Sequence, residues 1–236
     1  MAIERTPRAA LRWAAISGAV MLVFSLILQR VFPKVMGPLP AGIHSPVLAF
    51  ELARSRAEVE TMFGAAASPE RVRWVAQMNA GNLYDFGFLI VYAGFLWACC
   101  ATFPHTRSRF SSGLALAAGA ADAIENVCLF AISAQLGGDY EAALRALLVM
   151  TWAKWFAIAG CLALLSQALW VRGAIDSRVA ALPSAVVLPV AVCACVMRGS
   201  WAEGMLLAIS LAFFALWIEV LLTQRRAAQL AATRRR

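Results

Sequence analysis

The sequence has few charged residues for its length. Only 14% of its 236 residues are Asp, Glu, Lys or Arg, and 62% are hydrophobic. Soluble domains usually carry about a quarter charged residues, and the mean hydropathy of this chain is +0.73. The composition therefore excludes an ordinary soluble domain. It predicts a single integral membrane domain over residues 1–236.

Histidine is also scarce, and the cysteines lack the spacing of a metal or redox motif. His44 and His105 lie outside the apolar runs, so we expect no haem and no multi-histidine metal centre. Cys193 and Cys195 would point about 200° apart on a helix, which prevents them from sharing one metal. We find no nucleotide-binding motif and no internal repeat, and we expect neither a metal nor another cofactor. The cysteines are interpreted as small buried apolar residues: Cys99, Cys100, Cys128, Cys161, Cys193 and Cys195.

The net charge of +8 does not indicate nucleic-acid binding, because the basic residues gather at the ends of apolar runs. Such residues orient membrane helices and contact anionic lipid headgroups. We therefore expect membrane lipids, and no nucleic acid, as partners. The basic residues that flank the first and last runs are Arg5, Arg8, Arg12, Arg225, Arg226 and Arg234–Arg236.

Several apolar runs are long enough to cross a hydrocarbon core of about 30 Å as helices. The sequence predicts an all-α polytopic membrane bundle of about six transmembrane helices, with a kink in the fifth at Pro183 and Pro189. An excess of basic residues on the side of both termini predicts cytoplasmic termini in a bacterial inner membrane. The predicted spans lie near residues 13–32, 80–103, 112–136, 143–170, 179–197 and 202–223.

The first connection, residues 33–79, is the one long loop. Ser45 followed by Pro46 is typical of a helix start, and Gly64 of a helix end, which predicts one amphipathic outer helix over 45–64. This helix could lie on the outer membrane surface or cap the bundle. Ser68 predicts that the second spanning helix begins outside the membrane. Segment 45–79 is also a candidate contact surface for a protein partner.

The third span contains an unusual polar group in "GAADAIENVCLF", residues 119–130. Asp122, Glu125 and Asn126 share one helical face. A carboxylate facing lipid costs several kcal/mol, so we expect this face to point into the bundle. Lys154, in "MTWAKWFA" of the fourth span, lies at a similar depth and is predicted to pair with Glu125 or Asp122. Thr151, on the same face as Lys154, could add a hydrogen bond.

The second span adds polar residues in "MNAGNLYDFGFLIVY". Asn82, Asp85 and Tyr92 fall on one face, and Arg30 is the predicted counter-charge for Asp85. One lysine cannot neutralise all of the acids. Either Arg30 contributes, or one acid is protonated at neutral pH.

A purely structural interpretation is equally simple, because a buried acid–lysine pair can serve only to fix helix register. Asp85, near the interface, could be a solvated helix cap. Glu219, near the inner end of the last span, is expected to snorkel or to pair locally.

Three segments between residues 48 and 130, "LAFELARS", "YDFGFLIVY" and "ADAIEN", resemble a group of bacterial multi-pass membrane proteins of uncharacterised activity. The resemblance implies no reaction, but it adds Glu51 to the positions of interest beside Asp85 and the third-span acids. Sterol-isomerase-like proteins and membrane terpene cyclases also place acids among aromatic residues in small bundles. That likeness is one of architecture only.

Three functions fit these features. The first is a membrane-embedded enzyme performing acid–base isomerisation or cyclisation of an isoprenoid or lipid, so that the partner is a lipophilic small molecule. Alternatives are a proton- or cation-coupled carrier of small solutes and a non-catalytic assembly or binding subunit. In the first case the candidate catalytic residues are Asp122, Glu125 and Lys154, and the candidate substrate-binding residues are Asp85, Asn126, Tyr92, Asn82, Glu51 and Trp155.

Overall fold

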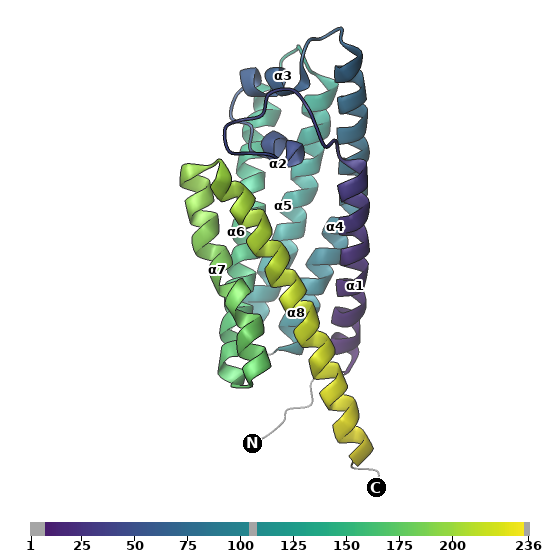
Figure 1. Ribbon diagram of the computed structural model, residues 1–236, viewed down its shortest axis with the longest axis vertical. Helices are drawn as coiled ribbons and strands as arrows, with labels where there is room; N and C mark the ends of the chain where they lie inside the picture. Colours follow the sequence, from purple (N-terminus) through teal and green to yellow (C-terminus); the bar gives the residue numbers. More distant parts are fainter. Residues whose placement is uncertain (1–7, 104–107, 234–236) are drawn as a thin grey trace.

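The computed structural model describes residues 8–103 and 108–233, and within these residues the regular structure is helical. Six helices are long and apolar enough to cross a membrane, which confirms the predicted polytopic bundle. Two shorter helices lie between the first and second of them (Figure 1). The helices are α1 Arg8–Val31, α2 Pro46–Glu51, α3 Arg56–Phe63, α4 Pro69–Thr102, α5 Ser108–Ala134, α6 Glu141–Arg172, α7 Ile175–Met197 and α8 Ser200–Thr233.

The long helices form a closed ring in chain order. Each of α1, α4, α5, α6 and α7 packs against the next long helix, and α8 returns to pack against α1. The connections between α5 and α6, α6 and α7, and α7 and α8 are short, so these neighbours run antiparallel (Figure 1). Helices α2 and α3 lie at the end where α4 begins, and we call this the cap end. At the opposite end, α1 begins and α8 ends.

The spanning helices extend beyond the predicted apolar runs. Helix α4 begins at Pro69, because the Ser68 hydroxyl accepts a hydrogen bond from the Arg71 amide at 3.1 Å, as its capping pattern predicts. Pro183 and Pro189 both lie inside α7, which continues through them. Several sequence predictions concern Arg5, His105 and Arg234–Arg236, which lie outside the described residues.

The first loop folds as two short helices, so the prediction of one helix over 45–64 is wrong. Leu52 ends α2, and Ser55 starts α3 by accepting a hydrogen bond from the Glu58 amide at 3.2 Å. Glu58 reaches back to the Arg54 amide at 2.9 Å. The letters "SRAE" have the spacing of a capping box, although Glu58 here accepts from the amide one residue before the Ser55 cap, and they begin a new helix in mid-segment.

Helices α2 and α3, which we call the cap, close over the bundle with their apolar side chains turned inward. Leu48, Phe50, Met62 and Phe63 are all buried. Of the two predicted placements, capping the bundle is therefore the correct one.

Hydrogen bonds and one ion pair, all made by charged side chains, hold the cap to the ends of the spanning helices. Glu203 of α8 accepts hydrogen bonds from the His44 and Ser45 amides at 2.7 and 2.8 Å. Arg198 binds both carboxylate oxygens of Glu58, at 2.9 and 2.8 Å, and these hydrogen bonds hold the pKa of Glu58 below its ordinary value. The cap is thus fixed to the α7–α8 connection.

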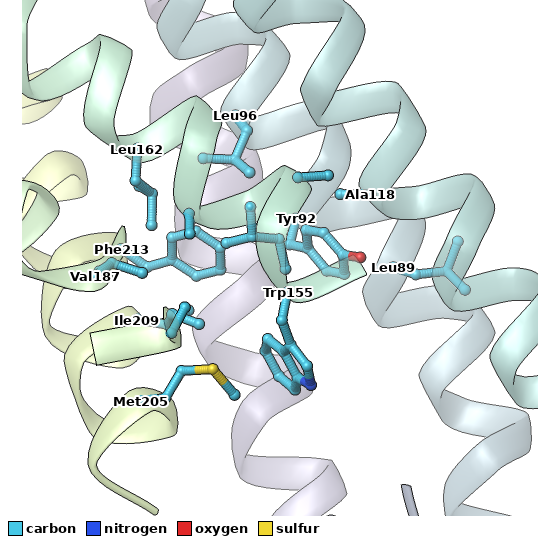
Figure 2. Close-up of a cluster of buried hydrophobic side chains, with 14 of the residues drawn as sticks. Leu89, Tyr92, Leu96, Ala118, Trp155, Leu162, Val187, Met205, Ile209 and Phe213 are labelled. Carbon is cyan, nitrogen blue, oxygen red and sulfur yellow. The ribbon is translucent and has the colours of Figure 1, made fainter. Parts of the chain in front are cut away.

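Large side chains fill the centre of the ring below the cap. Tyr92 stacks on Phe213 with ring centroids 6.2 Å apart, and Phe95 meets Phe213 edge-on. Leu96 and Leu162 are fully buried beside them (Figure 2). The ring therefore surrounds a packed core in this region rather than a pore.

The cysteines are all free thiols, as expected from their spacing. Cys99, Cys100, Cys128 and Cys161 are buried, whereas Cys193 and Cys195 are partly exposed. The sulfurs of Cys100 and Cys161 lie 3.8 Å apart.

Candidate functional site

The Lys154 ammonium group lies at the centre of a buried ionic cluster. Its Nζ is 2.5 Å from Glu125 Oε1, 3.3 Å from Asp122 Oδ1 and 3.4 Å from Glu51 Oε2. The predicted pairing with Glu125 or Asp122 is confirmed, because Lys154 contacts both. Lys154 is only 4% exposed and Glu125 only 1%, so these charges are shielded from solvent.

Helices α4 and α5 contribute further polar side chains to the site, at different depths along the bundle. The Tyr92 hydroxyl of α4 donates to Asp122 Oδ2 at 2.8 Å, which leaves Asp122 held between Tyr92 and Lys154. One helical turn along α5, Asn126 donates from Nδ2 to Asp85 Oδ2, also at 2.8 Å. The polar chain therefore runs across α6, α5 and α4 toward the cap end.

The hydrogen-bond partner of the Asp85 carboxylate is Asn126, and Arg30 does not pair with it. Arg30 is exposed, and no ion pair joins it to Asp85 within residues 8–103 and 108–233. The prediction that Arg30 is the counter-charge for Asp85 is therefore wrong. Asp85 is half-buried inside the polar chain, rather than a solvated cap at the membrane surface.

The cap contributes one carboxylate to the site, that of Glu51. It is the last residue of α2, and the Thr151 hydroxyl donates to its backbone carbonyl at 3.2 Å. Thr151 thus adds a hydrogen bond, as predicted, but its acceptor is a backbone carbonyl of the cap, so the bond ties α2 to α6 beside Lys154. Residue spacing within the spans could not place Glu51 here. Only the family resemblance pointed to it.

Trp155 completes the surroundings of Lys154. The ammonium nitrogen lies 4.4 Å from the centroid of the Trp155 ring, within the range of a cation–π interaction. The indole Nε1 of Trp155 is buried without a hydrogen-bond partner. Figure 2 shows this ring beside Tyr92 and Met205 in the packed interior.

Three buried polar groups of the site have unused hydrogen-bonding capacity. Neither atom of the Asn82 carboxamide has a hydrogen-bond partner, although Asn82 is only 1% exposed. Glu125 Oε2 and Trp155 Nε1 are also buried and unpartnered. An unmade hydrogen bond in the interior costs about 1–3 kcal/mol, so each of these groups would gain stability from a polar partner.

The charges of the site do not balance. Glu51, Asp122 and Glu125 contact Lys154, and Asp85 joins them through Asn126. Four carboxyl groups thus share one ammonium. Burying several uncompensated charges is far more costly than binding protons, so we expect at least one carboxyl to be protonated at neutral pH.

Glu51 gives this expectation a measurable pH dependence. Burial raises the pKa of Glu51 from 4.5 to about 7, Lys154 partly opposes the rise, and Asp122 adds to it. Because the folded protein binds this proton more tightly than the unfolded chain, stability should fall as pH rises through that window. Glu51→Gln mimics the protonated acid, so it should stabilise the protein at pH 8 by about 1–3 kcal/mol and change little near pH 4.5.

Thermal unfolding in detergent at several pH values measures this effect. Glu141→Gln is a matched control, because Glu141 is an acid in an exposed i,i+4 pair with Arg145. A Glu51→Gln protein that is less stable than wild type at pH 8 would show that Glu51 is needed as an anion.

A second polar cluster lies at the end opposite the cap. Glu219 is buried, and its Oε1 accepts hydrogen bonds from Ser177 at 2.7 Å and Thr223 at 3.2 Å. Arg226 lies 3.7 Å from Glu219 and also pairs with Asp176. The expected local pairing of Glu219 is confirmed, but the side chain does not snorkel. This cluster joins α7 to α8.

Comparisons with known proteins assign no function to either cluster. No protein-family model, curated protein or solved structure matches the chain. Within the described part of the chain, no group of three or more His, Cys, Asp or Glu side chains is arranged to hold a metal ion. The fold and these contacts define a polytopic helical membrane protein with a buried acid–lysine site.

Proposed function

We propose that this protein is a membrane-embedded enzyme that performs acid–base chemistry on a lipophilic substrate, such as isomerisation or cyclisation of an isoprenoid or lipid. The observation that carries the proposal is the surplus of carboxyl groups around Lys154 in a packed interior. A protonated carboxyl next to an ammonium can give up its proton, because the cation stabilises the carboxylate that remains.

Glu125 is the best placed proton donor. Its Oε1 contacts Lys154 at 2.5 Å, and its Oε2 is buried without a hydrogen-bond partner. Asp122, by contrast, is engaged by Tyr92 as well as by Lys154. In an isomerisation, the Glu125 proton would pass to one carbon of a double bond and leave a carbocation on the other carbon. A neighbouring carboxylate, Asp122 or Glu51, would then remove a proton from the next carbon on the far side of the cation, so that the double bond forms there.

The remaining residues suit substrate orientation. The unpartnered Asn82 carboxamide and Trp155 indole could hydrogen-bond a polar headgroup of the substrate. Glu51 and Asp85 are half-buried, whereas Asp122, Glu125 and Lys154 are buried. The site is therefore least covered toward the cap end, which favours substrate access from that side.

The packing below the site favours an enzyme over a carrier. Tyr92, Phe213 and Leu96 fill the ring between the ionic cluster and the opposite end. A carrier would have to open this aromatic core during every transport cycle. An enzyme needs only a path from the lipid or the cap to the carboxyl groups.

Solvent deuterium provides a test that does not require knowing the substrate. Protein reconstituted with a total bacterial membrane lipid extract is incubated in D₂O, and the lipids are then analysed by mass spectrometry for carbon-bound deuterium. We expect one lipid species to gain deuterium with the wild-type protein. Asp122→Asn and Glu125→Gln should each reduce the incorporation at least tenfold, in the range of general acid–base contributions.

The control for this experiment is Glu141→Gln, which removes an exposed acid of α6 and should leave the incorporation unchanged. Gel filtration of each variant separates loss of chemistry from loss of folding. Incorporation that is equal in wild type, Glu125→Gln and protein-free vesicles would overturn the proposal.

We further propose that the protein lies in a bacterial inner membrane with its termini in the cytoplasm. Arg8 and Arg12 at the start of α1 and Arg225 and Arg226 near the end of α8 support this orientation through the positive-inside rule. A green fluorescent protein fused after residue 236 should fluoresce, and alkaline phosphatase fused there should be inactive. The reverse pattern would contradict the orientation.

A further inference from the structure

Apolar packing closes the acid–lysine site on the side that faces away from the cap. Helix α5 runs from that end toward the cap, and residues 113–121, which precede Asp122, are only glycine, alanine and leucine. At about 1.5 Å per residue this segment is roughly 13 Å long. Leu96, Leu162 and Phe213 fill the ring beside it (Figure 2). Water in protein interiors is held by polar partners, so this apolar layer disfavours a water-filled path for protons.

Polar side chains continue from the site in the other direction, along the inward face of α4. Successive residues of this face are three or four positions apart, which places them on one stripe of the helix. Asn82 lies one turn from Asp85 on the cap side, because α4 begins at the cap end with Pro69. All members of the stripe are buried except the half-buried Asp85: Met78, Asn82, Asp85, Leu89, Tyr92 and Leu96.

The polar side chains on the cap side have unused hydrogen-bonding capacity. Both polar atoms of the Asn82 carboxamide are buried without a partner. The same is true of Asn79 Oδ1, one turn nearer the cap on α4, and of Ser133 Oγ near the cap end of α5. Buried water typically makes about three hydrogen bonds to such groups. These side chains are therefore suited to hold water between the cap-side surface and Asp85.

The cap provides the second half of this route through Glu51. Its side chain is 13% exposed, against 1% for Glu125, and it also lies 3.4 Å from the Lys154 ammonium. Glu51 therefore reaches both the solvent side and the ammonium that Asp122 and Glu125 share. Burial raises the pKa of Glu51 to about 7, Lys154 opposes the rise, and Asp122 and Asp85 add to it. A carboxyl with such a pKa takes up and releases protons near neutral pH.

We propose that the acid–lysine site exchanges protons only with the aqueous phase on the cap side, through water held by Asn82 and through the carboxyl groups of Asp85 and Glu51. Each step moves a proton from water or a carboxyl O–H to a carboxylate oxygen, so that one O–H bond breaks as another forms. This route goes beyond the proposed function, because it does not depend on whether the site isomerises a lipid. A proton-coupled carrier, by contrast, must connect its site to both sides in turn.

Vesicles with a pH difference across the membrane test the sidedness. A soluble domain fused after residue 236 and reconstitution into preformed vesicles enrich the orientation with the α8 end outside and the cap inside, because these parts lie at opposite ends of the bundle (Figure 1). Cleavage of the fusion by an added protease measures the enrichment. Infrared spectroscopy then follows the band of protonated carboxyl groups while the outer pH is raised across the pKa of Glu51, about 7.

Raising the outer pH should remove no more of the band than the uncleaved fraction of molecules accounts for. A proton ionophore, which then raises the inner pH, should remove the pH-sensitive remainder. Loss of the band from the cleaved fraction before the ionophore is added would show proton exchange from the α8 end and would overturn the proposal. A band that persists after the ionophore would overturn it as well, because the site would then exchange protons with neither side.

Asn82→Leu tests the path itself, since it removes the buried carboxamide and keeps an apolar side chain of similar size. Rapid mixing in detergent should show that the band is lost about tenfold more slowly than in wild type, the factor expected for one buried hydrogen-bonding step. The final extent of the loss should not change. Asn79→Leu repeats the test one turn nearer the surface.

The matched control is Thr102→Val, which also removes an unpartnered buried oxygen from α4, but at the end opposite the cap. Its rate should equal that of wild type. Slowing by Thr102→Val instead of Asn82→Leu would place the route at the opposite end. Equal rates in wild type, Asn82→Leu and Asn79→Leu would show that protons do not pass along α4. Either result would contradict the proposed path, whatever the outcome of the lipid deuterium experiment.

Discussion

Replacing Lys154 with Met is expected to lower the free energy of unfolding by about 3–5 kcal/mol. The substitution keeps the length of the side chain but removes the one ammonium that contacts Glu51, Asp122 and Glu125. These buried acids would then have to bind protons or admit water. Chemical or thermal unfolding in detergent measures the loss, which should be larger at pH 8 than at pH 5, because protonation relieves the unpaired acids.

The double variant Lys154→Met/Glu125→Gln, together with the two single variants, completes a double-mutant cycle that isolates the Lys154–Glu125 ion pair. It should recover part of the stability lost in Lys154→Met, because Glu125 no longer brings an uncompensated charge. Arg145→Gln, which breaks only an exposed pair, should change stability by less than about 1 kcal/mol. A Lys154→Met protein as stable as wild type at pH 8 would contradict the buried ionic cluster.

Gly18→Ala is expected to have the second largest effect. A Cβ atom at Gly18 would lie 2.1 Å from Cδ1 of Trp217, which is too close for any contact between carbons. The Trp217 indole also donates to the Ala15 carbonyl at 3.0 Å, so the ring cannot move aside without losing that bond. Overpacking of this kind costs about 1–3 kcal/mol, and here it separates α1 from α8.

Gly94→Ala is the matched control for Gly18→Ala. Gly94 lies inside α4, and nothing comes within 4 Å of a Cβ atom built on it. Alanine there should stabilise the helix by about 0.5–1 kcal/mol. Opposite signs for the two glycine variants support the α1–α8 contact. Equal and small effects would indicate that these helices do not pack through Gly18.

The sequence alone predicts the spanning helices and the centre of the site. Long apolar runs are a local property, and bilayer thickness fixes how many residues they need. The inward face of Asp122 and Glu125 follows from helical spacing and from the cost of a carboxylate in lipid. The depth of Lys154 follows from counting residues along two antiparallel helices, and this is why its pairing could be predicted.

The contacts that depend on the cap were harder to predict. Glu51 reaches Lys154 only because segment 33–68 folds back over the bundle as two helices. The break between α2 and α3 has a local signal in Ser55 and Glu58, but that signal does not say where the cap packs. The partner of Asp85 was missed because Asn126 and Arg30 fit the same sequence pattern equally well.

A purely structural ion pair remains the simplest alternative to catalysis, and the proposed experiments separate the two. Both interpretations expect Lys154→Met to be unstable. Only catalysis expects deuterium to enter a lipid and the conservative Glu125→Gln variant to stop it while the protein stays folded. The amide of Gln keeps the shape of Glu and removes its proton-donor chemistry.

Infrared difference spectroscopy of the purified protein tests the central claim most directly. Because four carboxyl groups share one ammonium, the spectrum at pH 7 should contain a carbonyl band from protonated carboxyl groups that shifts in D₂O. Glu125→Gln should weaken that band, because Glu125 is the proposed proton donor. A wild-type spectrum without any protonated carboxyl band at pH 7 would show that the acids are fully ionised, and the account of a buried, proton-storing site would be wrong.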